Sequence, residues 1–387
     1  MDQSIVNKRI GLVANTAWNL FHFRAELMSQ LKEDGNQVFC IAPADGNENK
    51  LEPYCHRFVA LEKLQRKGTS AKTDLALYHE LVFIFKELQL DLVLCYTVKP
   101  NIYGTLAAHR LNIPAVNTIT GLGFAFLENR LINKIVVRLY KYALQKSARV
   151  IFQNKDDRHL FIKKGLVKAG RTTLVRGSGI NTDFFNPSKN VHRGDTNIRF
   201  LFVGRLLYDK GVMELLNGFA EAAANVNNIQ LHLVGDTDSG NPASVEEADL
   251  SPFRTRNDII FHGYQEDVIP FLAPADVVIL PSYREGLPRV ILEGMSMGKP
   301  VITTNVPGCK EMVVNGQNGI LVDVKSSQAI ASAIQRMVLL TSEQRAQMGT
   351  WARQEVLNKY SSEAVIQSYY LILHDIFAGQ RGIKKIN

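Results

Sequence analysis

The amino-acid sequence predicts an α/β protein with two doubly wound, Rossmann-like domains. Short apolar segments of strand length alternate with helical patterns, and the alternation runs through two successive series along the chain. Continuous apolar strands separated by helices are typical of parallel sheets that are buried on both faces. The length of 387 residues also exceeds what one hydrophobic core usually accommodates, which favours two domains.

The two series are separated by a segment rich in Gly, Asn, Asp and Pro, residues 177–197, which predicts a domain boundary. We expect an N-terminal domain over residues 1–180, a C-terminal domain over residues 197–360, and a last helix over residues 362–379 that is able to pack back on the first domain. Ligands of open α/β sheets bind beyond the carboxyl ends of the strands, so two facing sheets would share one interdomain cleft. The expected strands lie at residues 9–15, 37–43, 91–96, 114–119, 149–154 and 173–177 in the first domain, and at 198–205, 229–236, 258–263, 276–282, 300–305 and 319–324 in the second.

The composition is that of a soluble globular protein, with 46% hydrophobic and 21% charged residues. No apolar run approaches the roughly 18 residues that a membrane-spanning helix needs, and the N-terminus lacks the pattern of a signal peptide. The four cysteines form no CxxC pair, so we expect buried thiols rather than disulfides or a metal site.

The net charge of +8 is unevenly distributed, because the whole excess of Lys and Arg lies in residues 1–180. Such a basic half indicates an anionic partner surface. The segment 129–149 places Arg130, Lys134, Arg138 and Lys141 near one helical face and apolar residues on the other. This pattern fits either a core helix with a solvated basic face or a helix that rests on anionic lipid. Nucleic acid is a weaker candidate, since no base-stacking aromatic pattern accompanies the charge.

Two familiar phosphate-binding motifs are excluded or weak. The stretch TGLGFAF, residues 120–126, begins like a dinucleotide fingerprint, but Phe126 replaces its third glycine, and no P-loop is present. A different set of cations follows the strand at 198–205, in the stretch VGRLLYDKG. Arg205 and Lys210 stand at its carboxyl end, where a guanidinium fork and an ammonium suit a diphosphate.

The stretch YREGLPRVILEGMSMGKP, residues 283–300, supplies two carboxylates and the start of a helix. Gly286 and Leu287 lead to Pro288, a residue favoured at the first helical position, and helix N-termini bind phosphate through their amides. Glu293 lies about 7–8 Å further along the helix axis, which suits the ribose of a nucleotide whose phosphates sit at the helix end. Glu285 precedes the helix, on the side where a donor sugar would lie.

With these motifs, the sequence resembles glycosyltransferase family 4, the retaining enzymes of the GT-B fold. The resemblance covers essentially the whole chain and is strongest over residues 198–324, while FHFR (21–24), TVKPNIYG (97–104) and NTITGLG (117–123) are similar to a bacterial branch. That branch adds N-acetylhexosamines to polyprenyl-diphosphate-linked sugars in surface-polysaccharide and glycoprotein assembly. The resemblance implies a UDP-sugar donor, with N-acetylgalactosamine and an α-1,3 linkage as the best candidate, and a cytoplasmic protein peripheral to the inner face of the plasma membrane.

The resemblance also implies roles for individual residues. Arg205 and Lys210 would bind the donor diphosphate, Glu285 the donor sugar and Glu293 the ribose. The loop from Gly286 through Leu287 to Pro288 would contact phosphate and sugar through its amides, with no metal or other cofactor required. The sequence departs from the family at Thr120, which stands where many members have a histidine, and threonine cannot shuttle a proton as imidazole does.

On the acceptor side we group Thr120 with three cationic residues. His22 and Arg24 stand after the first loop, and Lys99 follows the strand at 91–96, so that all three could meet an acceptor's diphosphate or be solvated surface residues. The cleft-facing loops of the first domain contain no Asp or Glu, which disfavours a covalent double displacement. We therefore expect front-face substitution, in which the leaving diphosphate oxygen takes the acceptor's proton, with Arg205, Lys210 and Glu285 as the catalytic set.

Two other function classes remain open from the sequence alone. A nucleotide-sugar 2-epimerase has the same architecture, but it would need acid and base residues where the first domain offers few. A non-catalytic nucleotide-sugar-binding protein is disfavoured by the intact set of Arg205, Lys210, Glu285 and Glu293.

Overall fold

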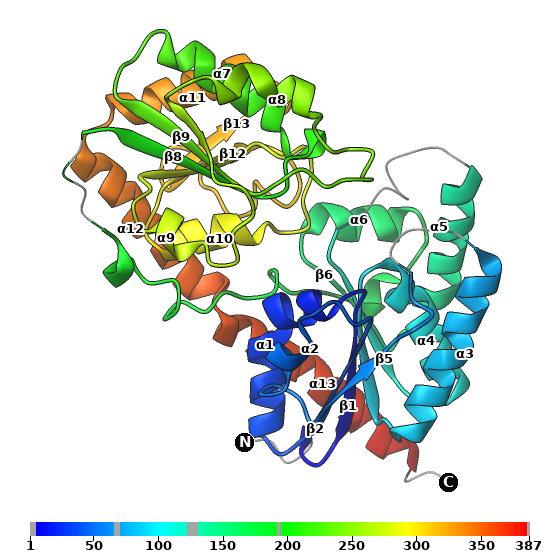
Figure 1. The fold of residues 1–387 in the computed structure, drawn as a ribbon. Coiled ribbons are helices and arrows are strands. Elements are labelled where there is room, and N and C mark those ends of the chain that lie inside the picture. Colours follow the sequence, from blue (N-terminus) through cyan, green and yellow to red (C-terminus); the bar gives the residue numbers. More distant parts are fainter. Residues whose placement is uncertain (1–4, 66–69, 122–130, 192–193, 195, 385–387) are drawn as a thin grey trace. The chain divides into compact units, whose positions relative to one another are not determined.

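The chain divides into two compact units in a computed structural model, which describes residues 5–65, 70–121, 131–191, 194 and 196–384. The first unit combines residues 1–179 with residues 362–387, and the second consists of residues 180–361. Each unit is a parallel sheet with helices on both faces (Figure 1). This is the doubly wound α/β fold that the alternation of strands and helices predicts.

The sheet of the first unit has seven parallel strands in the order β3-β2-β1-β4-β5-β6-β7. Three of them, β1, β4 and β5, are almost wholly buried, as expected for central strands. The strand β3 was not predicted, because its apolar run is short and its four residues are exposed or only half-buried. The strands are β1 Arg9–Val13, β2 Gln37–Ala42, β3 Arg57–Ala60, β4 Leu92–Tyr96, β5 Ala115–Ile119, β6 Arg149–Phe152 and β7 Thr172–Leu174.

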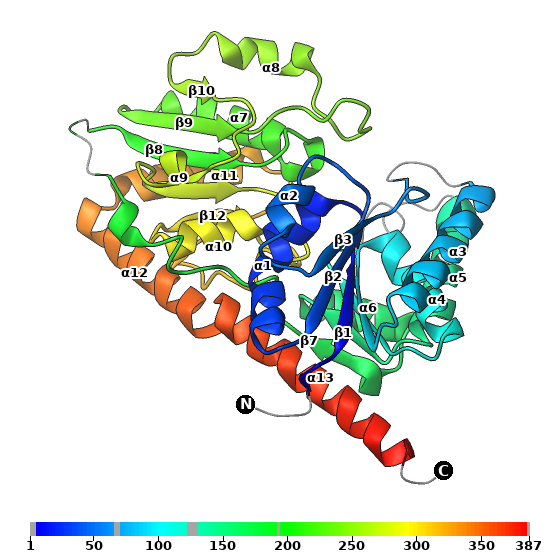
Figure 2. The same ribbon diagram turned by 60° about the horizontal axis from the view of Figure 1, so that its bottom comes forward.

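Helices cover both faces of this sheet (Figures 1 and 2). Alternate strand residues belong to the cores on its two faces. One face is covered by α1 Ala17–Glu33, α2 Glu48–Leu51 and the C-terminal helix α13 Ser362–Lys384. The other is covered by α3 Ala71–Glu87, α4 Thr105–Arg110 and α5 Leu131–Leu144, with α6 Lys155–Lys163 beside β6.

The helix α13 returns from the C-terminal end of the chain to complete the core of the first unit. Its side chains Val365, Tyr369, Leu373 and Phe377 are buried in that core. The Tyr369 hydroxyl lies 3.1 Å from the hydroxyl oxygen of Thr118, a residue of β5. The unit therefore takes its last helix from the far end of the sequence.

The sheet of the second unit has six parallel strands in the order β10-β9-β8-β11-β12-β13. Figure 1 shows α7 and α11 on one face of this sheet and α9 and α10 on the other. The strands are β8 Ile198–Val203, β9 Ile229–Val234, β10 Ile259–Phe261, β11 Val277–Leu280, β12 Val301–Thr304 and β13 Gly319–Val322. The helices are α7 Val212–Ala223, α8 Glu247–Arg254, α9 Ile269–Leu272, α10 Arg289–Ser296, α11 Ser327–Leu339 and α12 Ser342–Lys359.

The strand order of the second unit reverses between β8 and β11. From β8 the chain continues outward through β9 and β10, whereas from β11 it continues in the opposite direction through β12 and β13. At such a switch point the loops after the two strands diverge to opposite faces and leave a crevice for a ligand. The motifs predicted to bind the donor follow these two strands.

Candidate active site

Two loops meet at the carboxyl ends of β8 and β11. The first runs from Gly204 to a short 3₁₀ turn, Tyr208–Lys210, and the second precedes α10. The amide of Tyr283 donates to the carbonyl of Asp209 across 2.8 Å, which ties the two loops together. Because both loops leave the sheet at its switch point, their side chains share one edge of the second unit.

Lys210 and Glu285 form the central contact of this edge. The Lys210 ammonium lies 2.5 Å from Glu285 Oε1, and both side chains are largely buried. The Ser282 hydroxyl donates to the same carboxylate oxygen across 2.7 Å. Glu285 is thus fixed by two donors from different segments, and the ammonium lies beside the loop that starts α10.

The backbone around this pair is closely packed and depends on glycine. Gly211, which precedes α7, has φ +71°, and a Cβ there would lie 2.2 Å from the Pro281 carbonyl oxygen. Gly308 has φ +89°, and a Cβ there would lie 2.2 Å from the Glu285 carbonyl oxygen. Left-handed backbone is accessible to glycine at little cost. The two glycines therefore allow the Lys210 and Glu285 loops to approach the neighbouring chain.

The helix α10 begins directly after the second loop, with Arg289 as its first residue and Pro288 one position before it. The proline side chain makes no capping hydrogen bond to the first-turn amides, and amides at a helix start suit the oxygen atoms of a phosphate. Gly286 and Leu287 lie in the loop, and Leu287 packs against the core. This is the geometry expected for a phosphate-binding helix start, displaced by one residue from the predicted start.

Glu293 lies in the middle of α10 and is buried. Arg289 Nε donates to Glu293 Oε1 across 2.9 Å, one helical turn earlier. Burial raises the pKa of the Glu293 carboxyl, and the Arg289 charge and hydrogen bond partly counter this effect. The carboxylate is thus held in place, although its charge is costly there.

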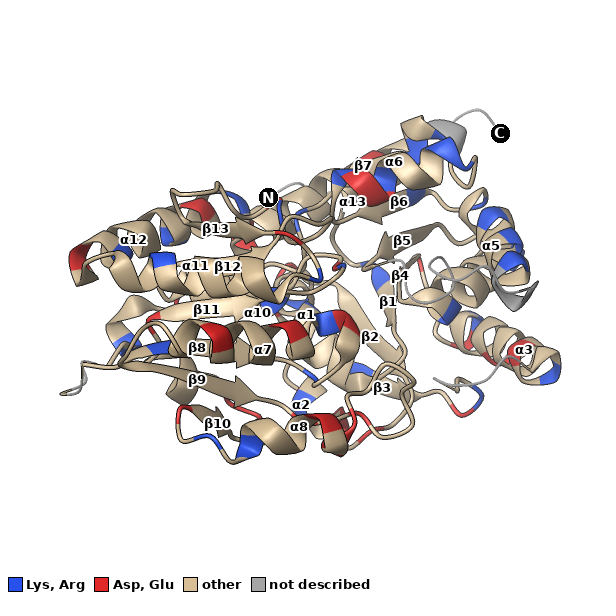
Figure 3. Ribbon diagram, turned by 90° about the horizontal axis from the view of Figure 1, so that it is seen from above, with Lys and Arg blue, Asp and Glu red and all other residues tan. Residues whose placement is uncertain are grey.

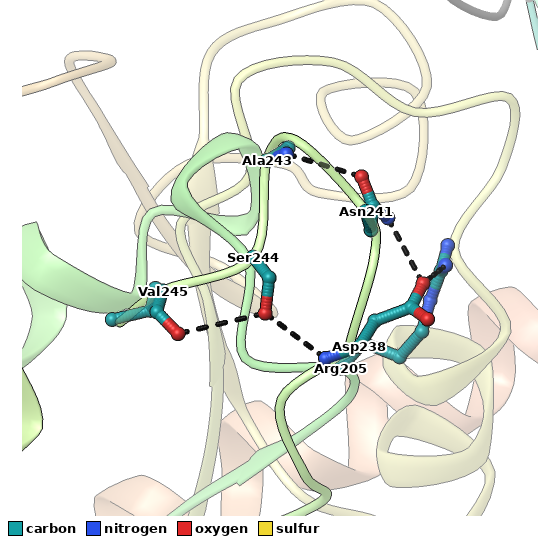
Figure 4. Close-up of polar contacts among 6 residues, drawn as sticks. All are labelled: Arg205, Asp238, Asn241, Ala243, Ser244 and Val245. Carbon is teal, nitrogen blue, oxygen red and sulfur yellow. Dashed lines mark hydrogen bonds and ion pairs between the residues drawn. The ribbon is translucent and has the colours of Figure 1, made fainter. Parts of the chain in front are cut away.

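Arg205 is paired with Asp238, a residue of the loop that follows β9 (Figure 4). Arg205 Nη1 lies 2.6 Å from Asp238 Oδ2, and the same oxygen accepts from Asn241 Nδ2 across 2.9 Å. The Asp238 amide donates to the Ser244 hydroxyl oxygen across 3.0 Å. The stretch GDTD could have indicated this contact, because its acids follow β9, the strand that pairs with β8.

Asp209 is a second functional candidate that the sequence did not single out. Its Oδ1 atom is buried and has no hydrogen-bond partner among the residues that the structure describes. Burial raises the pKa of its carboxyl, with Lys210 opposing and Glu285 adding to the shift. Asp209, which directly precedes Lys210, therefore places a buried hydrogen-bond acceptor atom beside the predicted diphosphate site.

The predicted acceptor residues lie in the first unit, and two of them differ from expectation. His22 and Arg24 were expected after a loop, but both lie inside α1, because Thr16 caps the helix by accepting from the Asn19 amide across 3.0 Å. Arg24 is buried rather than solvated, and its guanidinium lies 4.1 Å from the centroid of the Tyr96 ring. His22 stacks on Trp18, with the ring centroids 4.2 Å apart.

Lys99 and Thr120 follow adjacent strands of the same sheet, β4 and β5. Lys99 Nζ lies 2.8 Å from Asp74 Oδ1, so this cation is paired with a residue of α3. Near it, Thr97 has φ +68°, rare for a β-branched residue, and a π-helix follows over Pro100–Gly104. Both features are frequent at functional sites.

Three of the four residues predicted for membrane contact lie on α5. Lys134, Arg138 and Lys141 are exposed there, whereas Arg130 lies outside the described residues. The structure thus gathers Arg205, Lys210, Glu285, Glu293 and the loop to Pro288 at one edge of the second unit. The acceptor and membrane residues are all in the first unit.

Two doubly wound α/β units, the second carrying two cations and a helix start beyond the switch point of its sheet, are the architecture of glycosyltransferases of the GT-B fold. Residues 9–154 match the family described as Glycosyl transferase 4-like, and residues 197–339 match Glycosyl transferases group 1. The chain belongs to this family of glycosyltransferases, as its sequence motifs predict.

Similar proteins span between 70% and 95% of the chain. An N,N'-diacetylbacillosaminyl-diphospho-undecaprenol alpha-1,3-N-acetylgalactosaminyltransferase of Campylobacter jejuni is 27% identical over 384 residues, which is 95% of this chain and 98% of that one. A UDP-Gal:alpha-D-GlcNAc-diphosphoundecaprenol alpha-1,3-galactosyltransferase of Escherichia coli is 26% identical, covering 70% of this chain and 72% of its own. Anabaena HepE, solved with UDP and glucose, superposes with a TM-score of 0.79 at 20% identity, covering 95% and 99% of the two chains.

Proposed function

We propose that this glycosyltransferase moves an N-acetylhexosamine from a UDP-sugar to a polyprenyl-diphosphate-linked sugar in bacterial surface glycan or glycoprotein assembly. N-acetylgalactosamine and an α-1,3 linkage are the best candidates, since the Campylobacter relative's name states both. The names of that relative and the Escherichia coli one also state an undecaprenol-diphosphate-linked acceptor. The UDP donor is supported by the name of the Escherichia coli relative and by the UDP complex of HepE.

The contact between Lys210 and Glu285 beside the start of α10 carries this proposal. A diphosphate at the helix start would meet the first-turn amides, the Lys210 ammonium and the Arg205 guanidinium. Glu293, about one turn along the helix, would accept from the ribose hydroxyls. Glu285 would then face the donor sugar, with its carboxylate oriented by Ser282.

The proposed reaction is a front-face substitution with retention. The bond between the anomeric carbon and the diphosphate oxygen breaks, the acceptor oxygen bonds to the same face of that carbon, and the leaving oxygen takes the acceptor's proton. Fixed cations and amides stabilise charge that develops on the leaving diphosphate. Because protein groups supply that positive potential, we propose that transfer needs no metal, which activity in excess EDTA would test.

The acceptor would bind to the first unit, near His22, Arg24, Lys99 and Thr120. We propose a cytoplasmic protein that is peripheral on the inner face of the plasma membrane, with an anionic lipid surface as a partner and α5 as a contact. No helix among the described residues is long and apolar enough to cross a bilayer.

A donor screen with synthetic polyprenyl-diphosphate sugars tests the proposal most directly. We expect UDP-N-acetylgalactosamine to support transfer, and NMR of the product to show an α-anomeric configuration. A β-configured product would contradict retention, and a trapped glycosyl adduct on Glu285 would replace the front-face mechanism. Incubation of the donor alone separates the epimerase alternative, which would release UDP or interconvert sugars without any acceptor.

Substitution at Glu285 tests the site itself. Glu285→Gln keeps the shape of the side chain but removes its charge, and Glu285→Ala removes its contacts. We expect transfer to fall by about 10²–10³-fold in Glu285→Gln and to be lost in Glu285→Ala. Glu247→Gln, which breaks an exposed ion pair with Arg254 in the same unit, is the matched control and should leave transfer unchanged.

A further inference from the structure

The outer side of α3 carries cations and apolar side chains along one stripe. Its exposed members recur at intervals of three and four residues, which places them on one helical face. Two of them are large and apolar, since Leu75 is 58% exposed and Phe83 is 68% exposed. The stripe consists of Lys72, Leu75, His79, Phe83 and Lys86.

The acidic residues of α3 are each engaged in a contact, and two of them, Asp74 and Glu80, lie off this stripe. Asp74 accepts from Lys99 and from the Tyr103 hydroxyl, each across 2.8 Å. Glu80 accepts from the amides of residues 62 and 63. Glu87, at the end of the helix, pairs with Arg57 across 3.1 Å. The stripe therefore presents positive charge and apolar area, and the one exposed carboxylate beside it among the described residues of α3, Glu87, is paired with Arg57.

The helix α5 presents the same combination. Its exposed side chains include Lys134, Arg138 and Lys141, together with Ile135 at 54% and Tyr142 at 56% exposure. Its sequence, LINKIVVRLYKYAL, contains no acidic residue. Cations and apolar groups thus occupy the outward side of α5 together.

Both helices belong to one layer of the first unit. The buried side of α3 packs on Val13, Val93 and Cys95, and that of α5 on Val150 and Phe152, which line the same face of the sheet. The short helix α4 lies between them and contacts both. Figure 3 shows blue segments on the ribbons of both helices.

We propose that the outer side of α3 and α5 is the face by which this protein docks on an anionic bilayer, with Leu75, Phe83, Ile135 and Tyr142 inserted among the lipids. The inference rests on the proposed function, since a lipid-linked acceptor is reached at a membrane. Cations attract the face to anionic headgroups, and apolar side chains anchor it at the boundary with the acyl chains. Exposed apolar groups between cations favour lipid over nucleic acid, which would leave them in water.

Vesicle partitioning tests the two contributions separately. The probe is a set of vesicles of phosphatidylcholine alone or with phosphatidylglycerol, and binding is measured by sedimentation. Replacing Lys134, Arg138 and Lys141 by Gln should weaken binding to anionic vesicles by about fivefold per cation at low salt, an effect that high salt removes. The double variant Leu75→Ser, Phe83→Ser should weaken binding at both salt concentrations. Leu339→Ser, at a residue of the second unit that is 82% exposed, should change nothing.

Insertion is tested with a fluorophore on a single thiol. The four native cysteines are buried, so Phe83→Cys provides an accessible site for an environment-sensitive label. Its emission should shift to the blue with anionic vesicles, whereas a label on Leu339→Cys should not respond. An unshifted label on Phe83→Cys, or unchanged vesicle binding in the apolar double variant, would overturn the proposal. Loss of self-association or of nucleic-acid binding in that variant, with vesicle binding intact, would assign the face to a different partner.

A water-soluble, short-chain acceptor separates this inference from the proposed function. The apolar double variant should transfer sugar to that acceptor at the wild-type rate and lose activity only on acceptor held in vesicles. Failure of the wild-type protein to transfer to either acceptor, combined with vesicle binding as described, would contradict the proposed function and leave the docking face standing.

Discussion

At the residue scale, each cation predicted to meet the donor's diphosphate is paired with a carboxylate. Lys210 is paired with Glu285 and is largely buried, whereas Arg205 is paired with Asp238 and remains 54% exposed. An ion pair as exposed as the second is worth little, of order 0–1 kcal/mol. The two contacts therefore have different roles. The buried Lys210–Glu285 pair holds the two loops of the candidate site together, whereas the exposed Arg205 can readily leave Asp238 to bind a ligand's phosphate.

We predict that Asp238→Asn strengthens UDP binding. The carboxylate occupies Nη1 of the Arg205 guanidinium and repels an incoming diphosphate, so removal of its charge should lower the Kd for UDP by about two- to fivefold. Titration calorimetry at low salt measures this change. Asp258→Asn, which breaks the Arg256 pair in the same unit, is the control and should leave the Kd unchanged. Weaker UDP binding in Asp238→Asn would instead make Asp238 a positioning residue for Arg205.

Glu293→Gln should change how stability depends on pH. Burial raises the folded-state pKa of Glu293 above its usual 4.5, so the folded state favours the protonated carboxyl. That contribution to stability is present below the unfolded-state pKa and is lost as pH rises through the folded-state pKa. Relative to wild type, Glu293→Gln should therefore gain free energy of unfolding between about pH 4 and neutrality. Urea unfolding at pH 4 and at neutral pH, on Glu293→Gln and on wild type, measures the difference in their free energies of unfolding. A difference that does not change with pH would contradict a raised folded-state pKa for Glu293.

Individual residues differ in how far the sequence alone places them. The common position of Arg205, Lys210, Glu285 and Glu293 at one edge of the second unit could be predicted, because each follows a strand end or a helix start that the sequence marks. The burial of Arg24 could not, since it depends on where α1 starts and on Tyr96, a residue of a strand distant in sequence. The Arg205–Asp238 pair likewise depends on the pairing of β8 with β9.

At the element scale, strands were predicted well where apolar runs are long and poorly where they are short. The predicted strand at 198–205 became β8, and the one at 173–177 became the three-residue β7. Most predictions ran one or two residues past the carboxyl end, and some of the loops there begin with a small residue, such as Ala14 after β1 or Gly204 after β8. Those loops carry the site, so their conformation matters more than the strand bounds.

The loop before α7 gives a prediction about backbone conformation. Gly211→Ala would force a left-handed φ on alanine and place a Cβ 2.2 Å from the Pro281 carbonyl oxygen. We expect a loss of roughly 3 kcal/mol or more in the free energy of unfolding, with reduced transfer. Gly316→Ala is the control, because φ is +82° there but no atom lies within 4 Å of the added Cβ. Gly316→Ala should lower the free energy of unfolding by only about 1 kcal/mol, measured with urea. Equal losses in the two variants would mean that the chain at Pro281 shifts to make room for the Cβ at position 211.

At the scale of the whole molecule, the first unit is built from both ends of the chain, and the second unit from the residues between them. The sequence indicates a helix at the C-terminal end, but its packing depends on complementarity with a sheet formed by the first part of the chain. Buried residues along α13 and the contact between Tyr369 and Thr118 tie it to the first unit. Truncation before residue 362 should therefore expose the apolar face of the first sheet rather than shorten the second unit.

The division into units predicts where the donor nucleotide binds. The predicted donor residues, Arg205 through Glu293, all belong to residues 180–361, so this segment produced alone should bind UDP as the full chain does. Residues 1–179 should be insoluble alone but fold when joined to residues 362–387 by a short linker, since Gly179 and Ser362 are neighbours in the first unit. Far-ultraviolet circular dichroism and calorimetry on both pieces check this. A folded second unit that fails to bind UDP, or binding by the joined first unit, would place the donor site elsewhere.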